Sequence, residues 1–488
     1  MLKYLRQIAS ESIVYGLSGV ILRFLTIFLV PIYTRIFTPE DYGVLSLVTS
    51  TILVASTLAT LSLDSAAHRW YWETEELRDR KCTIATWVYC HLGVTLIFAA
   101  VIFLSASWLG RVIVGRADAG KYFQLAAFTL PLNVLWIVAN NWLRMQRRPW
   151  STTFHALANG LLIVSFTFLF VVVFRWGLEG IFSSQILAFG GTTILSGIIL
   201  GGWINPKHFH WVRFQEMFHY ALPLIPASLA LWVISFSDRY FIQIYTSTHE
   251  VGLYQVGSVI AAPVAIMSNA FQQAWWPFAL SIYKRPDAKQ VYANVFLAYI
   301  WITALISTAL ALFAPEAIWV FATEQYLGAS SVVGILALGY VMMGLYYIAS
   351  TGPNIVKATT SVGIVTVIAA GLNVLFNFIL VPYLGKEGSA LATLLSQSVV
   401  PVILFYRSQK LYPVPYRFMA GGAIFVLAFV LIAIGGYLQF DQIIWGIVFK
   451  LILMSLFVPV LFLLRILTIA QARQILNINW RSSPVSGN

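Results

Sequence analysis

The chain has 488 residues, of which 59% are hydrophobic and only 10% charged, and its mean hydropathy is +0.82. A soluble protein carries about 25% charged residues, so this composition excludes a soluble globular domain and indicates a membrane protein. The net charge of +12 arises without a lysine- and arginine-rich block interleaved with aromatic residues, which argues against nucleic-acid binding.

Apolar windows long enough to cross a hydrocarbon core predict about fourteen transmembrane helices. The predicted spans lie near residues 12–36, 43–67, 83–105, 121–143, 151–174, 180–203, 218–245, 251–280, 291–313, 331–351, 355–382, 388–406, 418–438 and 443–466. The predicted fold class is therefore an all-α polytopic membrane protein. The two cysteines, Cys82 and Cys90, form no metal-ligating pattern, and we predict neither a metal nor a cofactor.

The basic residues are distributed unequally between the two sets of loops. Of the 30 lysines and arginines, 21 fall in loops on one predicted side and three lie within spans. The opposite loops hold six, which are Arg35, Arg111, Arg116, Lys121, Arg175 and Lys386. The positive-inside rule then places both termini in the cytoplasm. The non-cytoplasmic loops are short, so we predict no enzyme and no catalytic residues.

Two loop motifs recur at nearly the same offset along the chain. "TPEDYGVLSL" (38–47) and "STHEVGLYQV" (247–256) align Gly43 with Gly252, 209 residues apart, and "WGLEG" (176–180) precedes "LGKEG" (384–388) by 208. These matches predict two six-helix lobes in parallel repeat, residues 1–210 and 211–412, followed by two further helices and a tail in 413–488. Transporters built from such repeats bind substrate between the halves.

Charged residues within the predicted spans are candidates for a site. Arg23 lies on the first span of the first half and Arg239 on the first span of the second half. An arginine fork suits phosphate oxygens, so both are predicted to bind an anion in a central cavity. The alternative is a structural charge paired with an acid, and for Arg239 the adjacent Asp238 offers such a partner. Lys450 is expected to snorkel to an interface.

Other polar residues complete the candidate substrate site. Arg35, at the end of the first span, adds a further cation. Asn269 and Gln272 carry amides that could contact sugars, although polar amides also hold transmembrane helices together.

Four stretches resemble a known family. They are "VPIYTRIFTPEDYGVLSL" (30–47), "SFSDRYF" (235–241), "VGLYQVGSVIAAPVAIMSNAFQQAWWPF" (251–278) and "AAGLNVLFNFILVPYLGKEGSALATLLS" (369–396). Together they resemble the Wzx-type polysaccharide biosynthesis flippases of the multidrug/oligosaccharidyl-lipid/polysaccharide exporter superfamily. The resemblance covers roughly residues 10–410.

This resemblance implies a flippase that moves an undecaprenyl-diphosphate-linked oligosaccharide across a bacterial inner membrane, from the cytoplasmic to the periplasmic leaflet. The polymer served would be O-antigen, capsule or exopolysaccharide. The family's membrane-embedded arginines carry over to Arg23 and Arg239. Ion antiport is expected, with a proton or sodium as the coupling ion, Asp64 as the first candidate carboxylate and Asp238 as its rival. Further expected partners are membrane lipids and a polysaccharide polymerase or other assembly protein.

Three alternatives remain open. A multidrug cation exporter of the same superfamily would need carboxylates in its cavity, whereas the clearest central charge here is Arg23. A lipid II flippase would differ only in the glycan. A membrane glycosyltransferase, polymerase or ligase would need a sizeable non-cytoplasmic loop with acid or base groups, which the sequence lacks.

Overall fold

A computed structural model describes residues 29–356, 358, 360–437 and 443–464, and every regular element in these residues is helical. After a helical stretch at residues 29–36, the first part of the chain forms α2 (Pro39–Ala59), α3 (Leu63–Glu73), α4 (Leu77–Leu104), α5 (Ala106–Leu109), α6 (Gly120–Ala127), α7 (Thr129–Met145), α8 (Pro149–Thr167), α9 (Gly177–Leu200), α10 (Trp211–Ala221) and α11 (Ile225–Phe236). The second part forms α12 (Asp238–Tyr245), α13 (Thr248–Ile282), α14 (Ala288–Leu312), α15 (Ala314–Phe321), α16 (Ser330–Ala349), α17 (Thr351–Ile355), α18 (Thr360–Leu411), α19 (Phe418–Tyr437), α20 (Ile443–Ser455) and α21 (Phe457–Leu463).

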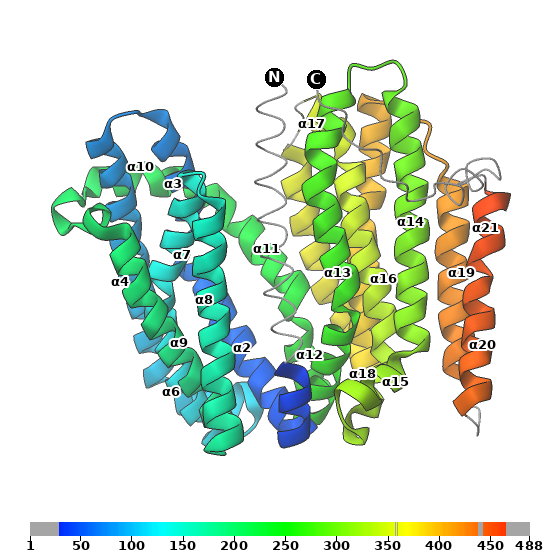
Figure 1. Ribbon diagram of the computed structural model, residues 1–488, viewed down its shortest axis with the longest axis horizontal. Coiled ribbons are helices and arrows are strands. Elements are labelled where there is room, and N and C mark those ends of the chain that lie inside the picture. Colours follow the sequence, from blue (N-terminus) through cyan, green and yellow to red (C-terminus); the bar gives the residue numbers. More distant parts are fainter. Residues whose placement is uncertain (1–28, 357, 359, 438–442, 465–488) are drawn as a thin grey trace, which may run out of the picture.

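The helices lie in two groups (Figure 1). One group contains α2–α4 and α6–α9, the other contains α11–α14, α16 and α18, and α2 of the first group meets α11–α13 of the second where the groups adjoin. The groups approach each other at the end where α12 and α15 lie and diverge toward the end where α10 and α17 lie. We call the diverging end the basic end, because its loops contain Arg144, Arg147, Arg148, Lys284 and Arg285, and the other end the opposite end. The lobe boundaries at residues 210 and 412 stay a prediction.

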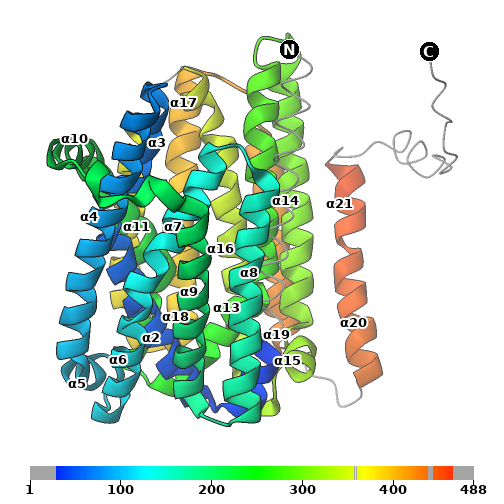
Figure 2. The same ribbon diagram turned by 60° about the vertical axis from the view of Figure 1, so that its left-hand side comes forward.

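Helices α19–α21 are appended to the second group. α19 packs along α14, and α20 and α21 stand at the outer edge of the molecule in both views (Figures 1 and 2). Lys450 on α20 forms an ion pair with Glu316 on α15, so its ammonium is held by a protein carboxylate. The expected snorkelling of Lys450 stays a prediction, and the ion pair adds a partner from α15, which lies in the loop between two predicted spans.

Twelve helical stretches among the described residues are long and apolar enough to cross a membrane. One of them, Gly363–Leu411, covers two predicted spans, 355–382 and 388–406. The predicted span 12–36 lies mostly outside the described residues. The all-helical, multi-pass membrane fold is thus confirmed, and the number fourteen stays a prediction.

The long helix α18 is interrupted once. Gly385 has φ 55° and ψ −133°, which are not helical, so the element consists of two segments, 360–384 and 386–411. Glycine is favoured here because a side chain is strained at positive φ. Hydrogen bonds between the two segments, such as Ser389 Oγ to Asn377 Oδ1 at 2.5 Å, show that they fold back on each other as a hairpin.

The second predicted spans of the two halves, α2 and α13, both begin at a side-chain N-cap. Thr38 caps α2 and forms a reciprocal capping box with Asp41, while Pro39 occupies the first turn without losing a hydrogen bond. Ser247 caps α13 by accepting a hydrogen bond from the Glu250 amide. Both caps lie at the opposite end, where α2 and α13 pack against each other.

Candidate functional site

The α11–α12 break carries a buried carboxylate. α11 ends at Phe236, and Asp238 begins α12 with only 2% of its surface exposed. Its Oδ2 accepts hydrogen bonds from Tyr254 Oη (2.5 Å) and Thr393 Oγ1 (2.9 Å), and its Oδ1 accepts one from Asn377 Nδ2 (3.3 Å). Within the described chain, no lysine or arginine donates a hydrogen bond to this carboxylate.

The rest of this cluster comes from the α18 hairpin. Asn373 and Asn377, one turn apart on the first segment, face Ser389, Thr393 and Ser396 on the second. Asn373 Nδ2 donates to Ser396 Oγ at 3.2 Å, and Asn373 Oδ1 accepts from Ser237 Oγ at 3.1 Å. All these side chains are buried. We call the set Ser237, Asp238, Tyr254, Asn373, Asn377, Ser389, Thr393 and Ser396 the Asp238 cluster.

The chemistry of the Asp238 cluster suits a small hard cation. A carboxylate among apolar helices is costly unless donors, a proton or a cation compensate its charge. Here three uncharged donors hold it, and the surrounding hydroxyl and amide oxygens are the ligand type that protons and hard metal cations prefer. No cluster of three or more histidine, cysteine or acidic residues that could hold a metal ion occurs among the described residues.

Arg239 points away from its neighbour, toward α2 and α13. Its Nε and Nη2 donate to Gln255 Oε1 at 3.0 and 2.8 Å, its Nε also donates to Ser46 Oγ at 3.1 Å, and its Nη1 donates to the Ser235 carbonyl at 2.9 Å. Ser46 Oγ donates to the same Gln255 oxygen at 3.1 Å. Arg239 is 6% exposed. In this conformation it joins the two helix groups, and we call Ser46, Arg239 and Gln255 the junction.

Two further contacts connect the groups near the junction. The hydroxyls of Thr51 on α2 and Tyr240 on α12 lie 2.9 Å apart. Gln243 Nε2 donates to the carbonyl oxygen of Val114 at 3.0 Å. Because Asp238, Arg239, Tyr240 and Gln243 share one eight-residue helix, a rearrangement around Asp238 reaches the contacts between the groups directly.

The other predicted site residues are dispersed. Asp64 lies in the first turn of α3, half-buried, after a break at Leu61 and Ser62, whose φ angles are 49° and 51°. Arg35 is exposed at the opposite end and donates to the Pro31 and Val320 carbonyls at 3.0 and 3.4 Å. Arg23 lies outside the described residues.

Asn269 and Gln272 also lie away from the Asp238 cluster. Both are partly exposed on α13, and Asn269 follows Tyr254 by 15 residues, or about 22 Å along the helix axis. The structure therefore does not bring these amides to Asp238.

Sequence reasoning missed much of the cluster and the junction. It named Asp238 and Arg239, but not Tyr254, Thr393 or Gln255 as their partners. One signal was present: Ser389, Thr393 and Ser396 have i, i+4, i+7 spacing and follow a glycine turn, and Asn373 and Asn377 are one turn apart before it. Two polar helical stripes flanking a turn indicate two facing helix surfaces.

Comparisons with known proteins agree with this architecture. The family model described as "Polysaccharide biosynthesis protein" matches residues 8–282. A comparison with curated proteins found no match.

Several solved structures share the fold. One described as "Lipid II flippase MurJ, inward closed conformation" is 14% identical, with a TM-score of 0.72 over 92% of this chain and 99% of its own. An inward-facing multidrug resistance MATE family transporter of the MOP superfamily is 16% identical, with a TM-score of 0.64 over 82% and 95%. A MATE structure in the straight conformation is 17% identical, with a TM-score of 0.57 over 86% and 96%.

Proposed function

The chain belongs to the polysaccharide biosynthesis protein family, and we propose that it is an ion-coupled flippase for a lipid-linked oligosaccharide. The observation that carries ion coupling is the buried Asp238 carboxylate, which shares a short helix with the contacts between the two helix groups. The substrate we propose is an undecaprenyl-diphosphate-linked glycan, moved from the cytoplasmic to the periplasmic leaflet of a bacterial inner membrane. The polymer served would be O-antigen, capsule or exopolysaccharide.

The orientation follows from charge. With 21 of the 30 basic residues in one set of loops, the basic end faces the cytoplasm and both termini lie there. The diverging helix groups then face the leaflet in which the glycan is assembled, and the junction lies toward the periplasm. A conformation of this kind would receive substrate, and the protein acts as a transporter rather than as an enzyme.

Coupling through Asp238 requires the cluster to rearrange when the ion binds. A proton or sodium ion at Asp238 would compete with the donors Tyr254, Thr393 and Asn377 for the carboxylate oxygens. Releasing those donors frees α12 from the α18 hairpin, and Arg239 on the same helix then shifts relative to Gln255 and Ser46. If the ion binds one state of the junction more tightly than the other, it shifts the equilibrium toward that state. Asp64, the first candidate by sequence, remains a candidate for this role.

Arg23 remains the proposed diphosphate-binding residue, because a guanidinium on a predicted transmembrane span would provide a charged, planar donor set. We expect Arg23→Ala to abolish glycan export at normal protein abundance, and Arg23→Lys to restore it only in part. Normal export by abundant Arg23→Ala protein would contradict this role.

The experiment that tests the function uses Asp238→Asn in cells lacking the native gene. The substitution removes the charge and keeps the shape, so we expect normal membrane insertion with export reduced about tenfold or more and lipid-linked glycan accumulating. The matched control is Asp118→Asn, an exposed carboxylate paired with Arg116, which should export normally. Normal export by abundant Asp238→Asn protein would contradict coupling at this residue.

A multidrug cation antiporter is the second candidate, because an unpaired buried carboxylate such as Asp238 also suits a cationic substrate, and MATE transporters share the fold. A lipid II flippase is the third, since MurJ shares the fold as well. If deletion of the gene abolished drug resistance and left surface polysaccharide normal, the multidrug antiporter would be supported. If deletion arrested peptidoglycan synthesis, the lipid II flippase would be supported.

A further inference from the structure

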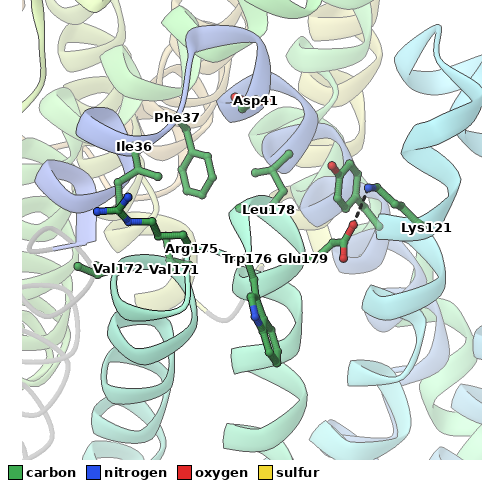
Figure 3. A pocket seen from close by; sticks show the side chains of 12 residues that line it. Ile36, Phe37, Asp41, Lys121, Val171, Val172, Arg175, Trp176, Leu178 and Glu179 are labelled. Carbon is green, nitrogen blue, oxygen red and sulfur yellow. Dashed lines mark hydrogen bonds and ion pairs between the residues drawn. The ribbon is translucent and has the colours of Figure 1, made fainter.

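A cavity of about 600 Å³ opens at the opposite end, within the first helix group (Figure 3). Residues 36–37, the first turns of α2 and α6, and the turn that joins the π-helical segment η3 (Phe168–Val173) to α9 form its walls. Phe37, Val171 and Leu178 supply a buried apolar lining. This volume lies within the range of small-ligand pockets in proteins.

The charged groups of this cavity balance one another. Lys121 forms an ion pair with Glu179 at 2.5 Å on one side, and the Arg175 side chain extends toward Ile36 on the other (Figure 3). Asp41 completes the set; its Oδ2 accepts hydrogen bonds from Thr38, and its Oδ1 keeps free acceptor capacity. The cavity thus presents two cations and two anions.

Arg175 is held in an unfavourable backbone conformation without an internal partner. Its φ is 57°, a region in which glycine is favoured and any side chain is strained. The side chain is exposed, and among the described residues no hydrogen bond or ion pair engages its guanidinium. Arg175 therefore lines the cavity with donors that no described residue engages, and these donors are available to a ligand.

Trp176 adds an aromatic surface at the rim. It is 51% exposed, and its ring stacks on Phe170 at 4.7 Å between centroids with planes 4° apart. Phe174 also lies against the indole, with 5.7 Å between centroids and planes 37° apart, and these two contacts fix a ring whose remaining surface is exposed. An apolar ring face beside fixed hydrogen-bonding groups matches a sugar ring, whose C–H face is apolar and whose hydroxyls lie around its edge.

We propose that this cavity binds sugar residues of the translocated glycan on the periplasmic side, an inference that rests on the proposed function. The balanced charges favour an uncharged polyol over a diphosphate, because a phosphate would meet the Asp41 and Glu179 carboxylates. Arg175 and Lys121 donate to sugar hydroxyls, Asp41 and Glu179 accept from them, and a following sugar packs on Trp176. We call this cavity the Arg175 pocket.

The test is equilibrium binding to the full-length protein in nanodiscs. The probe is the repeat-unit oligosaccharide cleaved from the cells' own surface polysaccharide and tritium-labelled at its reducing end. We expect saturable binding that weakens about tenfold in Arg175→Gly and in Trp176→Ala. The matched controls are Arg111→Ala and Trp108→Ala, an exposed arginine and an exposed tryptophan at the same end outside the pocket, which should bind as wild type.

Three outcomes would overturn the proposal: no saturable binding to the wild type, equal affinity of the pocket variants and the wild type, or displacement of the probe by inorganic diphosphate. Arg175→Gly also relieves the positive φ, so we expect it to raise the melting temperature while weakening binding, which separates ligand binding from folding. Asp238→Asn protein should bind the probe normally. Export measurements therefore test the proposed transport function, and probe binding separately tests the proposed sugar site.

Discussion

Gly43 and Gly252 face each other where α2 crosses α13. A Cβ atom on Gly43 would lie 2.0 Å from the carbonyl oxygen of Thr248, and one on Gly252 would lie 1.9 Å from the carbonyl oxygen of Pro39 and 3.1 Å from the Gly43 amide nitrogen. Neither clash can be relieved by a side-chain rotation, since the obstacle is backbone. The two glycines that the sequence offset pairs are therefore the residues that let α2 and α13, the second predicted spans of the two halves, touch.

We expect Gly252→Ala to force α2 and α13 apart and to lower the free energy of unfolding by about 1–3 kcal/mol, as overpacking does. Thermal unfolding in detergent measures this. Gly93→Ala on α4 is the control, because its Cβ meets open space and alanine should stabilise that helix by about 0.5–1 kcal/mol. Equal melting temperatures for Gly252→Ala and the wild type would mean that α2 and α13 can move apart at this crossing without loss of stability.

The junction can be tested by a double-mutant cycle. Arg239→Ala leaves Gln255 Oε1 with one donor, Ser46, and Gln255→Ala leaves the guanidinium poorly satisfied, so the two changes remove one shared interaction. We expect the double variant to lose less unfolding free energy than the sum of the single variants, by about 1–2 kcal/mol. Arg239→Ala combined with Ser196→Ala, whose hydroxyl contacts His155 instead, should be additive. Additivity at the junction would show that Arg239 and Gln255 act independently.

Topology is testable by thiol labelling in intact cells, after replacement of Cys82 and Cys90. Ala117→Cys and Glu324→Cys, both exposed at the opposite end, should react with an impermeant reagent added outside. Arg147→Cys, exposed at the basic end, should not. Gly115 is a less suitable position for an introduced cysteine, because its φ of 82° would strain any side chain. Labelling of Arg147→Cys from outside would reverse the orientation that the basic residues predict.

The Lys450–Glu316 pair holds the appended helices to the second group. Lys450→Met leaves the partly buried Glu316 carboxylate without its cation, so we expect a loss of about 1–3 kcal/mol in unfolding free energy. Combining it with Glu316→Gln should restore most of that loss, because the uncompensated charge disappears. Denaturing-detergent titrations of the two single variants and the double variant measure this. A double variant less stable than Lys450→Met would contradict a charge-based explanation.

The sequence predicted the all-helical membrane fold because hydropathy reports directly on lipid exposure. It also predicted the related starts of α2 and α13, since capping residues and a glycine at fixed offsets are local signals. Asp238 and Arg239 stood out because charges are rare in membrane helices. These inferences depend on single residues or short windows.

The pairings of those residues could not be predicted. Adjacent Asp238 and Arg239 look like partners in sequence, yet successive residues on a helix point in different directions, and each finds its partners on another helix. Tyr254 and Gln255 are also adjacent, yet Tyr254 hydrogen-bonds with Asp238 and Gln255 with Arg239. The Arg175 pocket was likewise invisible, because it depends on a positive φ and on the approach of α6 to α9.

The turn at Gly385 has a consequence for biogenesis. A single non-helical residue separates the two segments of α18, so we expect them to enter the bilayer as a pair. Asn373 and Asn377 would then leave the translocon already hydrogen-bonded to Ser396 and Ser389, rather than exposed to lipid one segment at a time. The hairpin thereby delivers a preassembled polar surface to Asp238, whose helix α12 precedes α18 in the chain, and supplies the carboxylate with the hydroxyl of Thr393 and the amide of Asn377 in one step.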